Sequence, residues 1–115
     1  MKDIATDIIY SKAKVSLDFK GSGLREALNF GFSYIESEDH IVEYVVANCT
    51  VMKNILTEVP EARLYPEKEA IGELWTAKLH ISDHLKDSEI IFSNNIFSAV
   101  INLNMDKIRS NNAYI

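Results

Sequence analysis

The stretch VSLDFKGSGLREALNFGFSYIE, residues 15–36, changes from one hydrophobic period to another within a few residues. In residues 15–19, apolar side chains alternate with polar ones, which predicts a half-buried β-strand. From Leu24 onward the apolar residues recur at helical spacing, which predicts a helix over residues 24–36 with Ser22 as its N-cap. Gly31 inside this helix costs about 1 kcal/mol relative to Ala and therefore suggests close packing against another element.

The rest of the chain alternates in the same way between short β-branched runs and one further amphipathic segment. The remaining elements that we expect are a strand at 41–47, a helix at 48–59 capped by Asn48 and ended by Pro60, a polar loop at 61–69, and strands at 74–81, 89–92 and 97–103. Helices early and strands late in the chain favour an α+β fold, with a mixed or antiparallel central sheet and two main helices packed on it.

The length and the charge of the chain restrict the classes of protein it can belong to. At 115 residues, 47% of them hydrophobic, the chain is expected to form a single domain over residues 1–115, with a core at about 15–108 and a frayed tail at about 109–115. The formal net charge is −5, and the 12 Lys and Arg residues are scattered, which argues against direct binding to nucleic acid or to an anionic membrane.

The sequence shows none of the patterns that are typical of secretion or of insertion into a membrane. The start of the chain lacks the apolar core of a secretory signal, and no window approaches the roughly 20 apolar residues that cross a bilayer. Cys49 is the single cysteine, so the chain has no intramolecular disulfide. We therefore expect a cytoplasmic protein.

The residue types that often carry chemistry do not form a specific pattern here. His80 and His84 are four apart, but they lie at the end of an expected strand and in its turn, and adding His40 defines no geometry. Cys49 lies where a strand meets a helix, and a helix N-terminus can activate a thiol, but no local family signature surrounds it. The sequence therefore predicts no catalytic residues, no metal and no cofactor, with a half-buried Cys49 and surface histidines.

The loop at 61–69 is the place where an interaction surface is expected. It mixes acidic and basic residues, and its Tyr65 lies next to a proline, where an aromatic ring is hard to bury. Arg and Tyr are the residue types favoured at interface hot spots, and Arg63 stands two positions before this Tyr. Arg63, Tyr65, Pro66 and Lys68 are thus the candidate subunit-interface residues.

Five segments of the chain, taken in order, resemble a known structural family. They are VSLDFKG leading into LREA, residues 15–27; VVANCTVM, residues 45–52; LYPEK, residues 64–68; IGELWTAKLHIS, residues 71–82; and KDSEIIF, residues 86–92. This ordered series is similar to the axial domain of the major capsid proteins of tailed bacteriophages and of encapsulin shell proteins. The resemblance covers roughly residues 15–108.

The resemblance implies a structural, self-assembling module and not an enzyme. In the family, the loop that corresponds to residues 61–69 meets its neighbours around the symmetry axes of the shell, so the implied partners are further copies of this chain or other capsid subunits, in the cytoplasm or in a virion shell. A complete shell subunit also has an N-terminal arm, an extended hairpin loop and a peripheral domain with a long spine helix. We therefore expect a stand-alone axial-domain protein or a fragment of a phage subunit.

Two other functions remain open at the level of the sequence. One is a small-ligand-binding or enzyme-associated regulatory domain of a truncated encapsulin relative, because a stand-alone relative needs a role other than enclosure. The other is a cysteine enzyme that uses Cys49 as its nucleophile.

Overall fold

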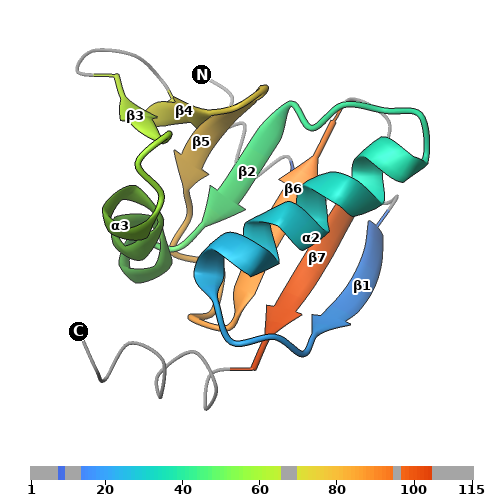
Figure 1. Cartoon of the computed structure of the whole chain (residues 1–115). Helices are drawn as coiled ribbons and strands as arrows, with labels where there is room; N and C mark the ends of the chain where they lie inside the picture. Colours follow the sequence, from blue (N-terminus) through green and yellow to red (C-terminus); the bar gives the residue numbers. More distant parts are fainter. Residues whose placement is uncertain (1–7, 10–13, 66–69, 95–96, 105–115) are drawn as a thin grey trace.

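The structure, a computed structural model, describes residues 8–9, 14–65, 70–94 and 97–104. Within these residues, seven strands form one mixed sheet that carries two helices (Figure 1). The predicted α+β class, with two helices packed on a mixed central sheet, is confirmed. The elements are β1 (Lys14–Phe19), α2 (Leu24–Ser37), β2 (Tyr44–Ala47), α3 (Cys49–Glu58), β3 (Arg63–Leu64), β4 (Gly72–Leu74), β5 (Ala77–Ile81), β6 (Glu89–Ser93) and β7 (Ser98–Leu103).

The order of the strands across the sheet is β1-β7-β6-β2-β5-β4-β3. β1 pairs parallel with β7, and β2 pairs parallel with β5, whereas the other neighbours run antiparallel. β1, the first strand in the chain, therefore pairs with β7, the last strand in the chain. Among the described strands, β1 and β3 form the two edges of the sheet.

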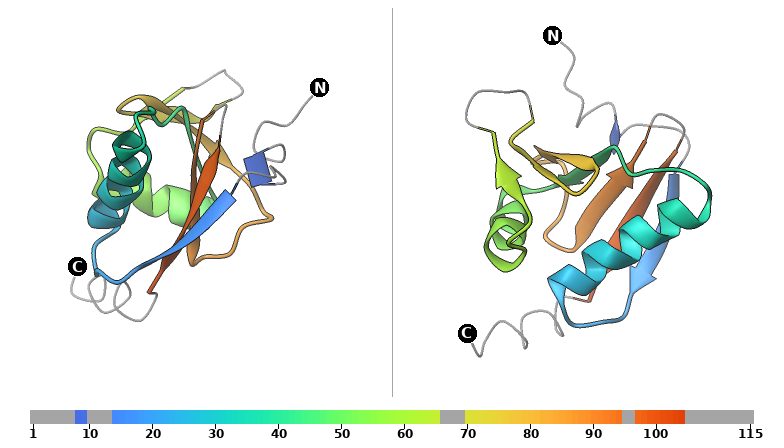
Figure 2. Two further views of the ribbon diagram at one scale, coloured as in Figure 1. Left: turned by 90° about the vertical axis from the view of Figure 1, so that its right-hand side faces the viewer. Right: turned by 45° about the horizontal axis from the view of Figure 1, so that its top comes forward.

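Helices α2 and α3 cover the same face of the sheet, and the helical residues Ile8 and Ile9 lie on the other face (Figure 2). Because side chains alternate across a strand, each central strand sends every second residue toward the helices. β2 contributes Val45 and Ala47 to this helix-side core, and β6 contributes Ile90 and Phe92; all four are fully buried. This side of the sheet holds most of the apolar core.

The contact between Gly31 of α2 and Phe92 of β6 determines how closely the first helix approaches the sheet. A Cβ atom on Gly31 would lie 2.3 Å from Cε1 of Phe92. The Phe92 ring also meets Phe32 of the same helix edge-to-face, at a centroid distance of 5.8 Å. The close packing expected at Gly31 is confirmed, because the phenyl ring occupies the space that a side chain would need.

The opposite face of the sheet carries a second, smaller apolar cluster. Val46 and Ile91 are buried there, together with Ile8 and Leu85. His80 points to this face as well and is only 6% exposed, next to the ring of Tyr44 at a centroid distance of 5.7 Å. The prediction that the histidines lie on the surface is therefore wrong for His80, because its position in β5 alternates with Leu79, which points into the helix-side core.

The two helices begin in different ways. Asn48 caps α3 as predicted: its side-chain oxygen accepts a hydrogen bond from the Val51 backbone N–H at 2.9 Å. Its Nδ2 donates to the Asp87 carboxylate at 2.5 Å, so the same residue joins the start of α3 to the turn before β6. The N-cap of α2, in contrast, is Gly23, without a side-chain hydrogen bond, so the prediction of Ser22 as the cap is wrong.

Three predicted segments differ from the structure. The strand expected at 74–81 is two antiparallel strands, β4 and β5, because the chain reverses at Trp75, whose φ of 54° is left-handed. Trp75 is therefore 40% exposed on a turn, where its ring packs edge-to-face on Phe32. The loop expected at 61–69 includes the short strand β3, and the strand expected from residue 41 begins only at Tyr44.

Replacing Gly31 with Ala is expected to destabilise the protein by up to about 2 kcal/mol. The helix gains about 1 kcal/mol of intrinsic propensity, but forcing a methyl group into a filled core costs about 1–3 kcal/mol. Phe92 is fully buried in a central strand and cannot move aside. The measurement is the free energy of unfolding from denaturant titration.

Two further variants show whether the clash causes the loss. Ser33→Ala, on the exposed side of the same helix, should be neutral or slightly stabilising because it changes propensity alone. In a Phe92→Leu background, Gly31→Ala should cost less than in the parent, since the smaller side chain leaves room. A Gly31→Ala protein more stable than the parent would contradict the packing described here.

Asn48→Ala is expected to destabilise the protein by about 1 kcal/mol through loss of the cap. Asn48→Ser keeps an oxygen that can cap the helix but loses the donor to Asp87, and it should fall between the parent and the Ala variant. Thermal and denaturant unfolding measure both effects. Equal losses for the two variants would mean that the bond to Asp87, and not the cap, carries the contribution.

Candidate interface at the β3 edge of the sheet

The predicted interface residues follow helix α3, where Pro60 ends the helix and the chain turns into β3. Arg63 pairs with Glu73 and Leu64 pairs with Gly72 in an antiparallel ladder. The two strands come very close at Gly72, where a Cβ atom would lie 2.0 Å from the carbonyl oxygen of Arg63. The absence of a side chain at position 72 thus allows this edge to form.

Tyr65 continues from β3 and is held at both ends. Its backbone N–H donates to the carbonyl oxygen of Ile71 at 2.7 Å, and its hydroxyl donates to the Glu73 carboxylate. The hydrogen bond to Glu73 raises the pKa of Tyr65 above its usual range. The ring predicted to be hard to bury is half-buried against its own hairpin.

The exposed side chains of the edge are Arg63 and Leu64. Leu64 is 64% exposed, more than any other large hydrophobic residue in the described part of the chain. Leu64 is not among the predicted interface residues, because a polar loop, and not a strand, is expected over residues 61–69. An apolar residue between Arg63 and Tyr65 in that loop was the signal available for it.

An ion pair fixes the start of the hairpin to the first helix. Arg25 of α2 donates to both carboxylate oxygens of Glu61, with Nη1 at 3.0 Å from Oε1. This hydrogen bonding lowers the pKa of Glu61 and raises that of Arg25. The two side chains are 48% and 38% exposed, so salt screens the pair, but its two-point geometry still orients the α3–β3 connection.

Of the four predicted interface residues, the structure therefore brings Arg63 and Tyr65 together on one edge and adds Leu64 between them. Pro66 and Lys68 lie outside the described residues. The β3 edge, defined here as Arg63, Leu64 and Tyr65, combines an exposed cation, an exposed aliphatic side chain and a fixed aromatic ring. Such a combination is suited to contact with another protein surface.

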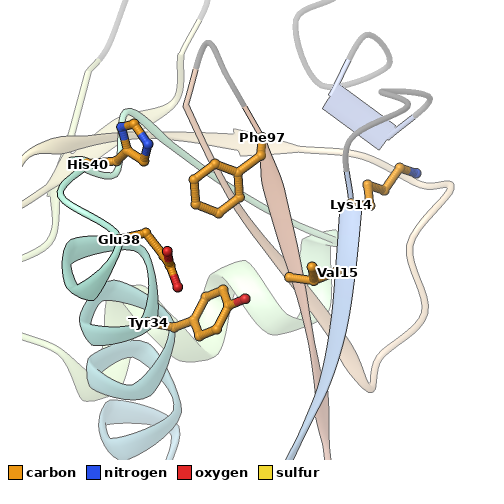
Figure 3. Close-up of a pocket in the computed structure, with 6 residues that line it drawn as sticks. All are labelled: Lys14, Val15, Tyr34, Glu38, His40 and Phe97. Atoms are coloured by element: carbon orange, nitrogen blue, oxygen red, sulfur yellow. The ribbon is translucent and has the colours of Figure 1, made fainter.

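A hollow of about 440 Å³ lies at the other side of the molecule, between the end of α2 and the starts of β1 and β7 (Figure 3). Val15, Tyr34 and Phe97 form its apolar wall, and Glu38 and His40 add polar groups. The imidazole of His40 meets the Phe97 ring edge-to-face at 5.4 Å. The volume of the hollow is within the range of small-molecule binding sites, which is roughly 300–1,000 Å³.

The residues considered for catalysis or metal binding are placed apart. Cys49 is exposed in the first turn of α3, so the expectation of a half-buried thiol is wrong. His40 lines the hollow, His80 lies on the far face of the sheet, and His84 is exposed in the turn after β5. Within the described residues, no three His, Cys, Asp or Glu side chains are grouped closely enough to hold a metal ion.

Comparison of the chain with protein-family models, with curated proteins and with solved structures gave no match. In the part of the chain that the structure describes, neither helix has the length and apolar character needed to span a bilayer.

Glu73→Gln is expected to lower the pKa of Tyr65 toward its ordinary value of about 10, because the amide oxygen is a weaker acceptor than the carboxylate. The raised pKa means that the stabilising effect of this bond is complete below about pH 10 and disappears as the pH rises through the folded-state pKa. Tyrosinate absorbance during alkaline titration measures the shift, and Tyr65→Phe identifies which of the 5 tyrosines is responsible. An unchanged titration in Glu73→Gln would contradict the bond.

Proposed function

We propose that this protein is a structural self-assembly module, similar to the axial domain of a phage major capsid or encapsulin shell protein, and that the β3 edge contacts a neighbouring subunit. The observation that carries the proposal is the 64% exposure of Leu64 on a hydrogen-bonded strand between Arg63 and Tyr65. The ordered sequence resemblance over residues 15–108 supports it.

The rigidity of the β3 edge favours binding over a purely connecting role. An interface residue that is already fixed loses little conformational entropy when a partner binds. Here the ladder with β4 and the Tyr65–Glu73 bond fix β3 within its own hairpin, and the Arg25–Glu61 pair joins the segment before β3 to α2. The apolar side chain of Leu64 would then gain contacts on association at a small entropic cost.

The charges around the edge suit contacts in a ring of subunits. Cyclic contacts are heterologous, so the β3 edge of one subunit meets a different patch on the next. Arg63 is exposed at this edge, opposite the half-buried Glu73 of β4, and a charge at the rim of an interface sets orientation and register more than affinity. The proposed partners are therefore copies of this chain or other capsid subunits, and the proposed role involves no enzymatic step by Cys49.

The hollow beside β1 favours one alternative, a small-ligand-binding or regulatory domain. Its wall of Val15, Tyr34 and Phe97 would take an apolar group, while Glu38 and His40 at its margin would orient polar substituents. A small molecule that stabilises the protein against heat, and that loses this effect in a Tyr34→Ala variant, would favour this function over assembly.

We expect Arg63→Glu with Tyr65→Ala to weaken self-association at least about tenfold, because hot-spot residues of these types each contribute more than 1 kcal/mol. Leu64→Ser should have a similar effect through loss of apolar contact. The measurement is sedimentation velocity at several protein and salt concentrations, with thermal unfolding as the check on folding.

Ile41→Ser is the matched control for Leu64→Ser. Ile41 is 58% exposed but lies in the connection between α2 and β2, away from the β3 edge. This variant should associate like the parent. If Ile41→Ser weakens association as much as Leu64→Ser, or if the double variant associates as well as the parent, the β3 edge is a connector and not an interface.

A further inference from the structure

The opposite edge of the sheet is a second surface with the features of an interface. β1 pairs with β7 over six residues, and no strand within the described residues pairs with its outer side. The unpaired N–H and C=O groups of an edge strand are a template for a further strand. Natural edges are usually shielded by charges, by proline or by a covering segment.

The shielding of β1 is weak on its helix side. Val15 on the strand and Phe30 on α2 are each 37% exposed, and Phe30 stacks at a tilt against Phe19, with ring centroids 5.6 Å apart. Leu17 and Tyr34 are partly buried beside them. A strip of apolar side chains, formed by these five residues, therefore follows the open edge of β1 and leads into the hollow of Figure 3.

The sequence of β1 is complementary to itself when it is read in the antiparallel direction. The residues from Lys14 to Asp18 read KVSLD, with opposite charges at the two ends, apolar residues inside them and Ser16 at the centre. Suppose that Ser16 of one copy lies opposite Ser16 of another copy in an antiparallel pair. Lys14 of each copy then lies opposite Asp18 of the other, and Val15 of each copy lies opposite Leu17 of the other, so each pair occurs twice. In Figure 3, Val15 points toward Tyr34 and Lys14 points the other way, so the apolar and the charged pairs fall on different faces.

We propose that β1 pairs antiparallel with β1 of a second copy of this chain, about a two-fold axis at Ser16, to form a continuous sheet across the dimer. A two-fold axis perpendicular to the sheet places one residue opposite itself, so the possible registers are few. Centring the pair on Leu17 would put Lys14 against Lys20 and remove both ion pairs. Centring it on Ser16 gives two Lys–Asp pairs and continues the apolar strip across the axis.

This dimer goes beyond the proposed function and does not depend on it. β1 and β3 are at opposite edges of the sheet, so the two surfaces can be altered separately. The dimer contact is isologous, whereas the contact proposed for the β3 edge is heterologous. All measurements below therefore use the full chain with Arg63→Glu and Tyr65→Ala already present, so that association through the β3 edge does not contribute.

The first experiment exchanges the two charges. Lys14→Glu or Asp18→Lys alone turns two attractive pairs into two repulsive ones, and each is expected to raise the dimer Kd by about tenfold. The double variant Lys14→Glu/Asp18→Lys restores opposite charges and should return the Kd to within about threefold of the starting protein. Sedimentation measures the Kd, and thermal unfolding verifies that these exposed substitutions leave the fold intact.

The second experiment tests the register by disulfide formation in a Cys49→Ala background. Cysteines at position 16 of the two copies would have Cα atoms about 4.5–5.5 Å apart, within the range that a disulfide spans. Ser16→Cys should therefore give a covalent dimer under mild oxidation. Lys20→Cys is the matched control, because it keeps both Lys14–Asp18 pairs and eight residues of offset separate its two copies by about 27 Å.

Three results would overturn the proposal. The first is a protein that stays monomeric at all concentrations, and the second is a charge-exchanged double variant that associates as weakly as either single variant. The third is Lys20→Cys crosslinking as fast as Ser16→Cys, which would indicate random collision in place of a defined register.

Discussion

Helix α2 lies directly on β6 because Gly31 has no side chain where the ring of Phe92 needs space. The same ring contacts Phe32, so two successive helix residues are set against one sheet residue. This contact positions the helix over β6 and its neighbour β7, in the half of the sheet that ends at β1. The helix-side core, and the connection from α2 to β2, are arranged around it.

Because α2 and α3 cover only one face of the sheet, the strands at its two edges are only partly shielded. The apolar residues that α2 and α3 enclose are those of the central strands, while the outer strands are only partly shielded. Each edge accordingly presents apolar side chains next to charges: Leu64 beside Arg63 at one edge, Val15 beside Lys14 at the other. The two contacts proposed for these edges are of different kinds: the heterologous one would by itself build a ring, and the two-fold one would join such rings in pairs.

The candidate site was only partly predictable from residue types. Arg63 and Tyr65 were identified because their side chains are typical of interfaces, and both do lie on one edge. Leu64 was not, since its exposure results from the pairing of β3 with β4, and this pairing depends on a close backbone approach at Gly72. The burial of His80 was also unpredictable, because it arises from strand alternation relative to a second apolar cluster.

The local hydrophobic period by itself determined the α+β class and the positions of β1, α2, α3, β6 and β7. The residue types at single positions determined the cap at Asn48 and the tight packing at Gly31. These features depend on neighbours a few residues apart, so the order of residue types is sufficient. Only the tertiary structure decided that β1 joins β7, that the chain reverses at Trp75, and that β1 and β3 become the edges. Those outcomes depend on pairing between segments far apart in the chain, and a short-range pattern carries no information about which strand will be the neighbour.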